Sequence, residues 1–426
     1  MSATAASRSP EQLRRPHFEV ADVFRLHGAS YRRTHRLPVP QLEVMSAIER
    51  CRTAALGGHV DECDACGHQR VSYNSCRNRH CPKCQASARR KWVEAQKQAL
   101  LPAEYFHVVF TLPDSINPLL RWNQRLLLNL LFKAVSETLL EFAGRHLGGE
   151  PGVTAVLHTW GQTLVAHPHL HCIVTGGARA KDGSRWTSCA RGYLFPVRAL
   201  SQVFRGKYCD LLGRACEQGR LLGAESLPLL ASPDSFLRYL RGLQQRAWVV
   251  YAKRPFAGPE QVIEYIGRYT HRVAISNHRI VAIGSDTVSF RWKDYGAGGR
   301  VKIMMLAAHE FIRRFQLHVL APEFVRIRHY GILANGHRKS KLARCRELLA
   351  SRAEVYRQAE GRAGTAIPEG QPTEEEEGAV CAACGVGRMQ RRVEWPPVCG
   401  PPRMAQSAVN AHSPYLSAAR FSPTIS

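Results

Sequence analysis

The chain has 426 residues, a length that supports two or three domains with cores of their own. Its formal net charge is +25, which predicts association with a polyanion, and nucleic acid is the first candidate. The sequence has no recognisable secretory signal, and polar and charged residues interrupt its most apolar stretch, 119–135, too often for a membrane span. We therefore expect a cytoplasmic protein without a membrane partner. The 14 cysteines are expected to be thiols and metal ligands rather than disulfides.

Helical and strand patterns are mixed along the chain, which predicts an α+β fold. Residues 1–20 are polar and expected to be disordered, and from about 359 onward the periodicity is lost and a disordered tail is expected. Between these ends the pattern predicts amphipathic helix within 20–56, strands over 105–112, 153–160, 163–175 and 248–252, a helix over 119–147, a helix that begins at Pro259, a hairpin of 280–283 with 287–292, and a helix over 307–320.

Six of the cysteines are concentrated in residues 51–84. Cys63 and Cys66 form one CxxC hook, Cys81 and Cys84 form a second, and 14 residues separate the hooks. Two hooks at this distance predict one tetrahedral Cys₄ site for structural Zn²⁺. Cys76 and His80 lie between the hooks and are candidates to replace or add a ligand.

The segment around these cysteines is basic, with Arg77, Arg79 and Lys83 close to the hooks. We interpret it as a DNA-contacting knuckle; the alternative is a metal-stapled support for the domain that follows. A further hook, Cys381 with Cys384, has no partner pair nearby, so it indicates a second zinc site only weakly.

Three histidines alternate in the predicted strand 163–175. Because alternate side chains of a strand share one face, His167, His169 and His171 are expected to line a single surface. Burying several imidazoles in an apolar strand requires partners for each of them, and a divalent metal ion is a suitable one. For the third ligand the sequence leaves three candidates open: His167 itself, His158 and Gln162.

The helix that begins at Pro259 carries Tyr265 and Tyr269 one turn apart. A phenol has a pKa near 10, so attack on phosphorus at neutral pH requires activation or a polarised phosphate. Arg268 and Arg272 lie within a turn and supply positive charge for DNA. The structural alternative, that both rings are core aromatics, is weaker beside a metal-binding strand in a basic chain.

Four segments together resemble a known family: the cysteine region, Leu157-His-Thr-Trp-Gly-Gln162, His167-Pro-His-Leu-His171, and the segment from Tyr265 to Asn277. They look like the two-tyrosine rolling-circle transposases of bacterial insertion sequences, in the HUH endonuclease superfamily. The resemblance covers about 18–335 and places the two HUH histidines at His169 and His171.

The resemblance implies an N-terminal zinc-binding domain (21–100), an HUH nuclease domain with a central antiparallel sheet and flanking helices (101–345), and a mostly disordered tail (346–426). It implies an enzyme of the bacterial cytoplasm and nucleoid that uses Mg²⁺ or Mn²⁺. Its partners would be single-stranded element ends and target DNA, and a homo-oligomer is compatible with this.

In the mechanism that the resemblance implies, Tyr265 or Tyr269 attacks one DNA strand, which gives a 5′-phosphotyrosine and a free 3′-OH. The second tyrosine permits another strand transfer, and no ATP is needed. The alternatives are a replication initiator or relaxase with the same chemistry, and a zinc-dependent DNA-binding regulator without catalysis.

Overall fold

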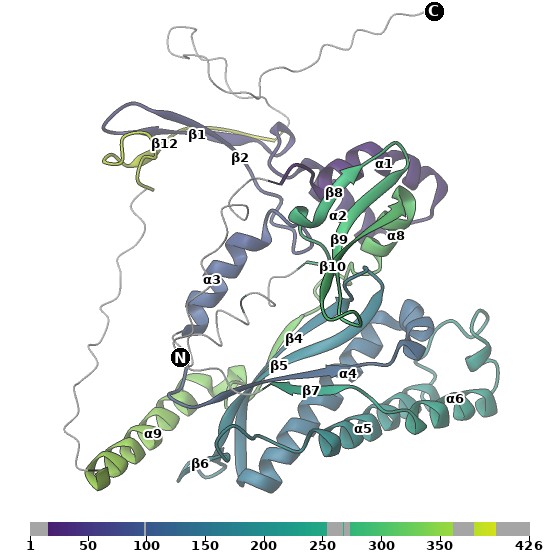
Figure 1. The fold of residues 1–426 in the computed structure, drawn as a ribbon, viewed down its shortest axis with the longest axis vertical. Coiled ribbons are helices and arrows are strands. Elements are labelled where there is room, and N and C mark those ends of the chain that lie inside the picture. The colour runs from purple at the N-terminus through teal and green to yellow at the C-terminus, as the bar shows by residue number, and fades with distance from the viewer. Residues whose placement is uncertain (1–15, 98, 254–266, 268–272, 361–378, 398–426) are drawn as a thin grey trace, which may run out of the picture. The chain divides into compact units, whose positions relative to one another are not determined.

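The computed structural model describes residues 16–97, 99–253, 267, 273–360 and 379–397 (Figure 1). The chain divides into two units, each of which is described by itself. The first comprises Met1–Cys51 and Ser75–Pro372, and the second Arg52–Asn74 and Thr373–Ser426. The first unit contains antiparallel sheets and helices, and the second contains an antiparallel sheet. The predicted α+β class is therefore confirmed. No helix among the described residues is both long and apolar enough to cross a membrane.

The first unit is built on a six-stranded sheet of order β11-β4-β5-β3-β7, in which β6 pairs with β5 and every pairing is antiparallel. Aromatic and β-branched residues favour these strands because their side chains pack well on a pleated surface. The strands are β3 (Tyr105–Thr111), β4 (Gly149–Trp160), β5 (Ala166–Ala180), β6 (Trp186–Ser188), β7 (Val250–Lys253) and β11 (Ile327–Gly331).

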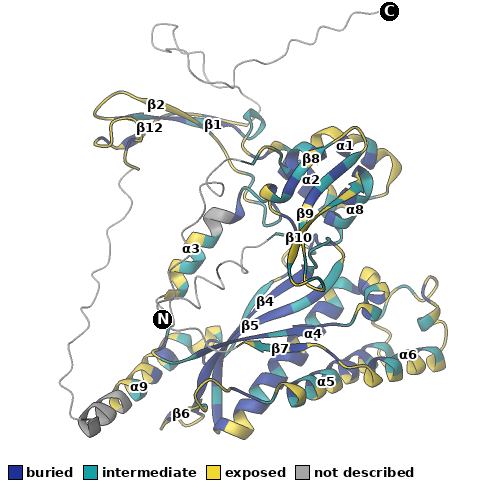
Figure 2. Ribbon diagram, viewed as in Figure 1, coloured by how far each residue is buried: buried dark blue, intermediate teal, exposed yellow. Residues whose placement is uncertain are grey.

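One face of this sheet is covered by helices and holds the main core (Figures 1 and 2). Phe106, Val108 and Phe110 alternate along β3 and are buried in that core with Leu170 and Cys172 of β5. The intervening residues of each strand therefore point to the opposite face, where the histidines lie. The covering helices are α4 (Asn117–Leu147), α5 (Val197–Glu217) and α6 (Pro233–Gln245).

A second core of the same unit joins segments that are distant in sequence. Phe24 from the N-terminal helices packs with Phe290, Phe311 and Phe315, which come from a three-stranded sheet and the helix after it. This core therefore contains residues from both sides of the predicted domain boundary near residue 100. The elements are α1 (Val20–Thr34), α2 (Val39–Arg50), β8 (Ile280–Ile283), β9 (Thr287–Asp294), β10 (Arg300–Ala307) and α8 (Ala308–Gln316), and the unit also contains α3 (Gln85–Lys97) and α9 (Arg338–Glu360).

The second unit is a small antiparallel sheet of order β12-β1-β2. Its strands are β1 (Gly58–Cys63), β2 (Gln69–Tyr73) and β12 (Met389–Trp395). The tail was expected to be mostly disordered, and two of its segments have regular structure, since α9 runs to Glu360 and β12 pairs with β1. The signal was missed because β12 is a short strand whose pairing partner lies more than 300 residues away.

Gly331 ends β11 in a conformation that requires glycine. Its φ is +63°, and a Cβ atom at this position would overlap the carbonyl oxygen of Pro151. We expect Gly331→Ala to lower the free energy of unfolding by about 2–4 kcal/mol. The positive φ strains an alanine backbone, and the overlap of its Cβ atom with Pro151 adds to this cost. Denaturant unfolding measures this. Gly336→Ala is the control, because Gly336 has ordinary φ and open space around it; equal losses in both variants would contradict the prediction.

Candidate metal centre and cysteine clusters

Three histidines meet on the face of the sheet opposite α4. His169 and His171 come from β5, and His158 lies directly across from His169 on β4. Each offers a nitrogen, and the three nitrogens all lie within 4.8 Å of one another. His158 and His171 are buried, whereas His169 is partly exposed. A cation bound here would be coordinated by side chains of the sheet, and solvent or a ligand would reach it from the side of His169.

Two of the rings are held by contacts through their Nδ1 atoms. His169 Nδ1 lies 2.6 Å from the carbonyl oxygen of His167, so this nitrogen carries the proton and donates it. His171 Nδ1 lies 2.8 Å from Nε2 of His107, and the two rings stack with centroids 5.0 Å apart. Contacts of this kind orient metal-ligating imidazoles and fix the nitrogen that faces the ion. Burial, with Lys253 as a smaller cause, lowers the pKa of His107 to about 4, so this ring is neutral.

Of the three candidates for a third ligand, the structure brings only His158 to the pair. The side chain of His167 is 43% exposed, and its Nδ1 lies 3.8 Å from a carboxylate oxygen of Asp114. The backbone carbonyl of Gln162 accepts a hydrogen bond from Arg279, and its side-chain oxygen lies 3.5 Å from the backbone nitrogen of Lys293. All three alternating histidines lie on β5, but the third member of the cluster comes from the neighbouring strand, because β4 and β5 pair with His158 opposite His169.

The two tyrosines fall outside the described residues. This applies to Tyr265 and Tyr269 and equally to Arg268 and Arg272. Gly267, between them, is described; it is buried, and a Cβ atom there would overlap Val93 of α3. The middle of this motif is therefore a position where the backbone approaches α3 closely.

The predicted zinc site of Cys63, Cys66, Cys81 and Cys84 is not formed, because its two hooks belong to different units. The second hook instead joins Cys51 and Cys76, so that the cluster is Cys51, Cys76, Cys81 and Cys84. Cys51 was missed because it is a single cysteine outside any hook. Its sulfur lies 3.6 Å from that of Cys84, as does the sulfur of Cys76.

His80, the other candidate near this cluster, is not one of its ligands. Its Nε2 accepts a hydrogen bond from the backbone N–H of Leu320, and burial lowers its pKa to about 3. The cluster is part of the second core, in which Cys51, Cys81 and Cys84 are buried together with residues of α1 and α2.

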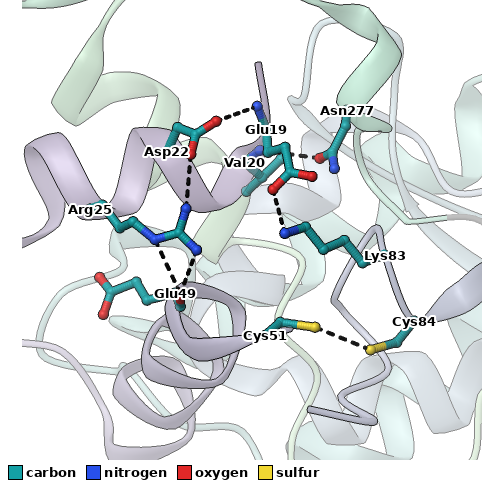
Figure 3. A network of polar contacts seen from close by, with 9 residues as sticks. All are labelled: Glu19, Val20, Asp22, Arg25, Glu49, Cys51, Lys83, Cys84 and Asn277. Carbon is teal, nitrogen blue, oxygen red and sulfur yellow. Dashed lines mark hydrogen bonds and ion pairs between the residues drawn. The ribbon is translucent and has the colours of Figure 1, made fainter. Parts of the chain in front are cut away.

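Figure 3 shows the polar contacts that tie this cluster to α1. Lys83, inside the hook, forms an ion pair with Glu19 at 2.5 Å. The backbone N–H of Val20 donates to the side-chain oxygen of Asn277. Asn277 therefore contacts the start of α1, next to the residue whose carboxylate pairs with the cysteine hook.

Two of the three knuckle cations that were predicted to contact DNA make contacts within the protein. Lys83 is paired with Glu19, and the Arg79 guanidinium donates to the backbone carbonyls of Ala321 and Phe324. Both cations therefore serve internal contacts. Among the three predicted residues of the knuckle, only Arg77 is exposed.

His318 joins the segment after α8 to the turn between β4 and β5, next to the histidine cluster. Its Nε2 donates to the carbonyl oxygen of Leu164 and its Nδ1 accepts from the hydroxyl of Thr159. Burial lowers its pKa to about 4, although the bond to Leu164 opposes the shift. This ring is neutral in the folded protein.

The His318 pKa predicts a loss of stability in acid. The unfolded chain takes up the proton first as the pH falls below about 6.5, so stability present above that pH is lost progressively toward pH 4, by up to ~3 kcal/mol. Denaturant unfolding at several pH values measures the slope. His318→Gln, which has no ionisable group, should show a shallower slope between pH 6.5 and 4; an unchanged slope would contradict the assignment.

Comparison with known proteins agrees with this architecture. Residues 152–341 match the family described as "Putative transposase", and residues 23–112 match the "Transposase zinc-binding domain". The first match spans the histidine strands, and the second spans the complete Cys51–Cys84 cluster. No solved structure matches the chain.

Two curated relatives extend over most of the chain. A protein of Sinorhizobium fredii named "Putative transposase y4qJ" is 50% identical over 392 residues, which are 90% of this chain and 97% of the relative. The "Transposase for insertion sequence element IS801" of Pseudomonas savastanoi pv. phaseolicola is 28% identical over 299 residues, 69% of this chain and 70% of the relative. These comparisons identify a transposase with an N-terminal zinc-binding domain. The chain belongs to the insertion-sequence transposase family that includes the IS801 enzyme.

Proposed function

We propose that this transposase nicks and rejoins single-stranded DNA at the ends of an insertion sequence by metal-assisted tyrosine transesterification. The observation that carries the proposal is the convergence of His158, His169 and His171 on one point of the sheet. Three imidazoles would fill only part of the coordination shell of Mg²⁺ or Mn²⁺, and the oxygen ligands that these ions prefer would come from DNA phosphate and water.

The donor set fits such an ion. The contacts of His169 with the His167 carbonyl and of His171 with His107 leave the Nε2 atom of each ring as the nitrogen suited to coordination. When bound, the ion would neutralise charge on the non-bridging oxygens of the scissile phosphate. The protein's own part is to hold the three rings in fixed orientation from β4 and β5.

Tyr265 and Tyr269 are the proposed nucleophiles, on the strength of the sequence motif. The phenol oxygen of one tyrosine forms a bond to phosphorus, and the bond from phosphorus to the 3′ oxygen breaks. The phenol loses its proton and the departing oxygen gains one, which leaves a 3′-OH and a 5′-phosphotyrosine. One phosphate ester replaces another, so the bond can later be returned to DNA without ATP.

We further propose that Cys51, Cys76, Cys81 and Cys84 hold a structural Zn²⁺. Three of these residues are buried in the core that contains α1, α2 and α8, so the metal would stabilise both the knuckle and that core. A metal-dependent core of this kind does not persist without its ion.

Removal of zinc should therefore unfold this region. We expect chelation to lower the free energy of unfolding by roughly 5 kcal/mol or more and to expose the amides of α1 and α2 to hydrogen exchange. Zn²⁺, but not Mg²⁺, should restore protection. Unchanged exchange in α1 and α2 after complete zinc removal would contradict the proposal.

The function is tested with labelled single-stranded oligonucleotides from candidate element ends. Incubation with Mg²⁺ or Mn²⁺ should give a covalent protein–DNA adduct and a released strand with a 3′-OH. Mass mapping should place the adduct on Tyr265 or Tyr269. Nicking without any adduct would indicate hydrolysis by water and would overturn the transesterification mechanism.

A further inference from the structure

The second unit contains four cysteines contributed by two hooks that lie more than 300 residues apart. Cys63 and Cys66 connect β1 to β2, whereas Cys381 and Cys384 precede β12. The four sulfurs lie within 4.8 Å of one another, with Cys63 to Cys384 at 3.7 Å and Cys66 to Cys381 at 3.8 Å. The zinc-binding match covers residues 23–112 and thus includes only the first hook.

These spacings discriminate between a disulfide and a metal centre. A disulfide holds its sulfurs about 2.05 Å apart, so neither pair is bonded. Four thiolates about 2.3 Å from a central zinc, in tetrahedral geometry, lie about 3.8 Å from each other. The observed separations agree with the second value.

The two hooks have similar backbone turns, although the second is closed by a bond that spans one residue more. In the first, the N–H of Cys63 donates to His68 and the N–H of Gly67 donates back to Cys63. In the second, the N–H of Cys381 donates to Gly387 and the N–H of Gly385 donates back to Cys381. The glycine after each second cysteine has a positive φ, +69° and +70°. Each hook is therefore a tight turn that aims two thiols at the same point.

Direct contacts also join the hooks. The backbone of Asp64 and that of Arg388 are hydrogen-bonded, and the Asp64 carboxylate accepts from the N–H of Arg388 at 2.8 Å. A Cβ atom at Gly387 would overlap Cys63, so only glycine permits the approach.

Apolar burial in the described part of this unit is small. Its buried hydrophobic cluster consists of Cys63, Cys381 and Met389, two of which are the cysteines themselves, and the other buried hydrophobic side chains described there are Val60 and Trp395. Sheets of this size normally need a metal ion or a disulfide for stability.

We infer that Cys63, Cys66, Cys381 and Cys384 bind a second structural Zn²⁺, which joins the C-terminal segment to the N-terminal zinc-binding region. The chain then holds two zinc ions, each bound by four cysteines. In the sequence, the β1–β2 hairpin that contributes to the second site lies between Cys51 and Cys76 of the first. The C-terminal segment from 379 to 397 is, on this inference, half of a zinc ribbon.

Zinc content of the purified full-length protein tests the inference. We expect Cys381→Ser with Cys384→Ser to lose one zinc per chain relative to the wild type. The matched control, Cys209→Ser with Cys216→Ser, changes two cysteines outside both clusters and should lose none. Unchanged zinc content in the C-terminal double variant would overturn the inference.

A second measurement uses the wild type alone, so it does not depend on the folding of a variant. Cys66 is exposed, and an exposed thiol without a metal is readily alkylated. We expect mass-mapped alkylation to leave Cys66 protected in the zinc-loaded protein and to modify it after chelation. Modification of Cys66 at the rate of a simple peptide thiol, with zinc present, would overturn the inference.

Discussion

Replacement of His158, His169 or His171 by alanine should reduce metal-dependent nicking at least about 100-fold. Each substitution removes one of three nitrogens that converge within 4.8 Å, and two imidazoles hold a labile divalent ion poorly. The loss should appear in the rate of strand cleavage under single-turnover conditions, with both Mg²⁺ and Mn²⁺ tested. Binding of the oligonucleotide should persist, because the positive charge of the protein is unchanged.

The matched control for these variants is His167→Ala. His167 belongs to the same strand but its side chain is half exposed and lies outside the histidine cluster. It should keep nearly full activity. Loss of activity in His167→Ala with retention in His158→Ala would reverse the assignment of the third ligand.

The double variant Tyr265→Phe with Tyr269→Phe should form no covalent adduct with DNA. Phenylalanine keeps the ring but removes the only oxygen that can bond to phosphorus. The adduct is measured on denaturing gels, where it should fall below detection while native DNA binding is retained. The hydroxyl carries the effect, so stability should change little.

Tyr295→Phe is the control for this pair, because Tyr295 is 71% exposed and far from the motif in sequence. It should form the adduct at the wild-type rate. Adducts that survive in the Tyr265 and Tyr269 double variant would identify another nucleophile and exclude the transesterification assignment. The same experiment separates the proposed enzyme from a regulator that only binds DNA.

Local sequence patterns predicted several sheet strands and the long helix α4 well, whereas the helices α5 and α9 were not predicted. The predicted strand 105–112 corresponds to β3, the hairpin to β8 and β9, and the long helix to α4, each within a few residues. These elements have strong periodicity or a high content of β-branched and aromatic residues, which act over short distances. Strands such as β10 and β12 were missed because their sequences carry only a weak local pattern.

The cysteine pairing could not be predicted from spacing. Cys63 and Cys81 belong to hooks of the same form, and the hook spacing alone made a single Cys₄ site the simplest solution. The actual partners, Cys51 for one hook and Cys381 for the other, are chosen by packing of α2 and by pairing of β1 with β12. Both determinants are contacts over long sequence distances.

The histidine site was predicted in part. Alternation on one strand placed His167, His169 and His171 on one face, and the family resemblance selected His169 and His171. That His158 rather than His167 lies beside this pair depends on the register of β4 against β5. The contact of His107 with His171 was missed altogether, since a lone histidine in a buried strand is most often a core residue. Its signal is visible only once β3 pairs with β5.

The central claim is that three histidines from two strands hold a divalent ion, and Mn²⁺ binding followed by electron paramagnetic resonance tests it most directly. The zinc-loaded wild type should bind one Mn²⁺, with hyperfine or superhyperfine coupling to imidazole nitrogen. His167→Ala should bind it equally well, and His158→Ala should lose it. Retention of nitrogen-coordinated Mn²⁺ in His158→Ala, His169→Ala and His171→Ala alike would contradict the account.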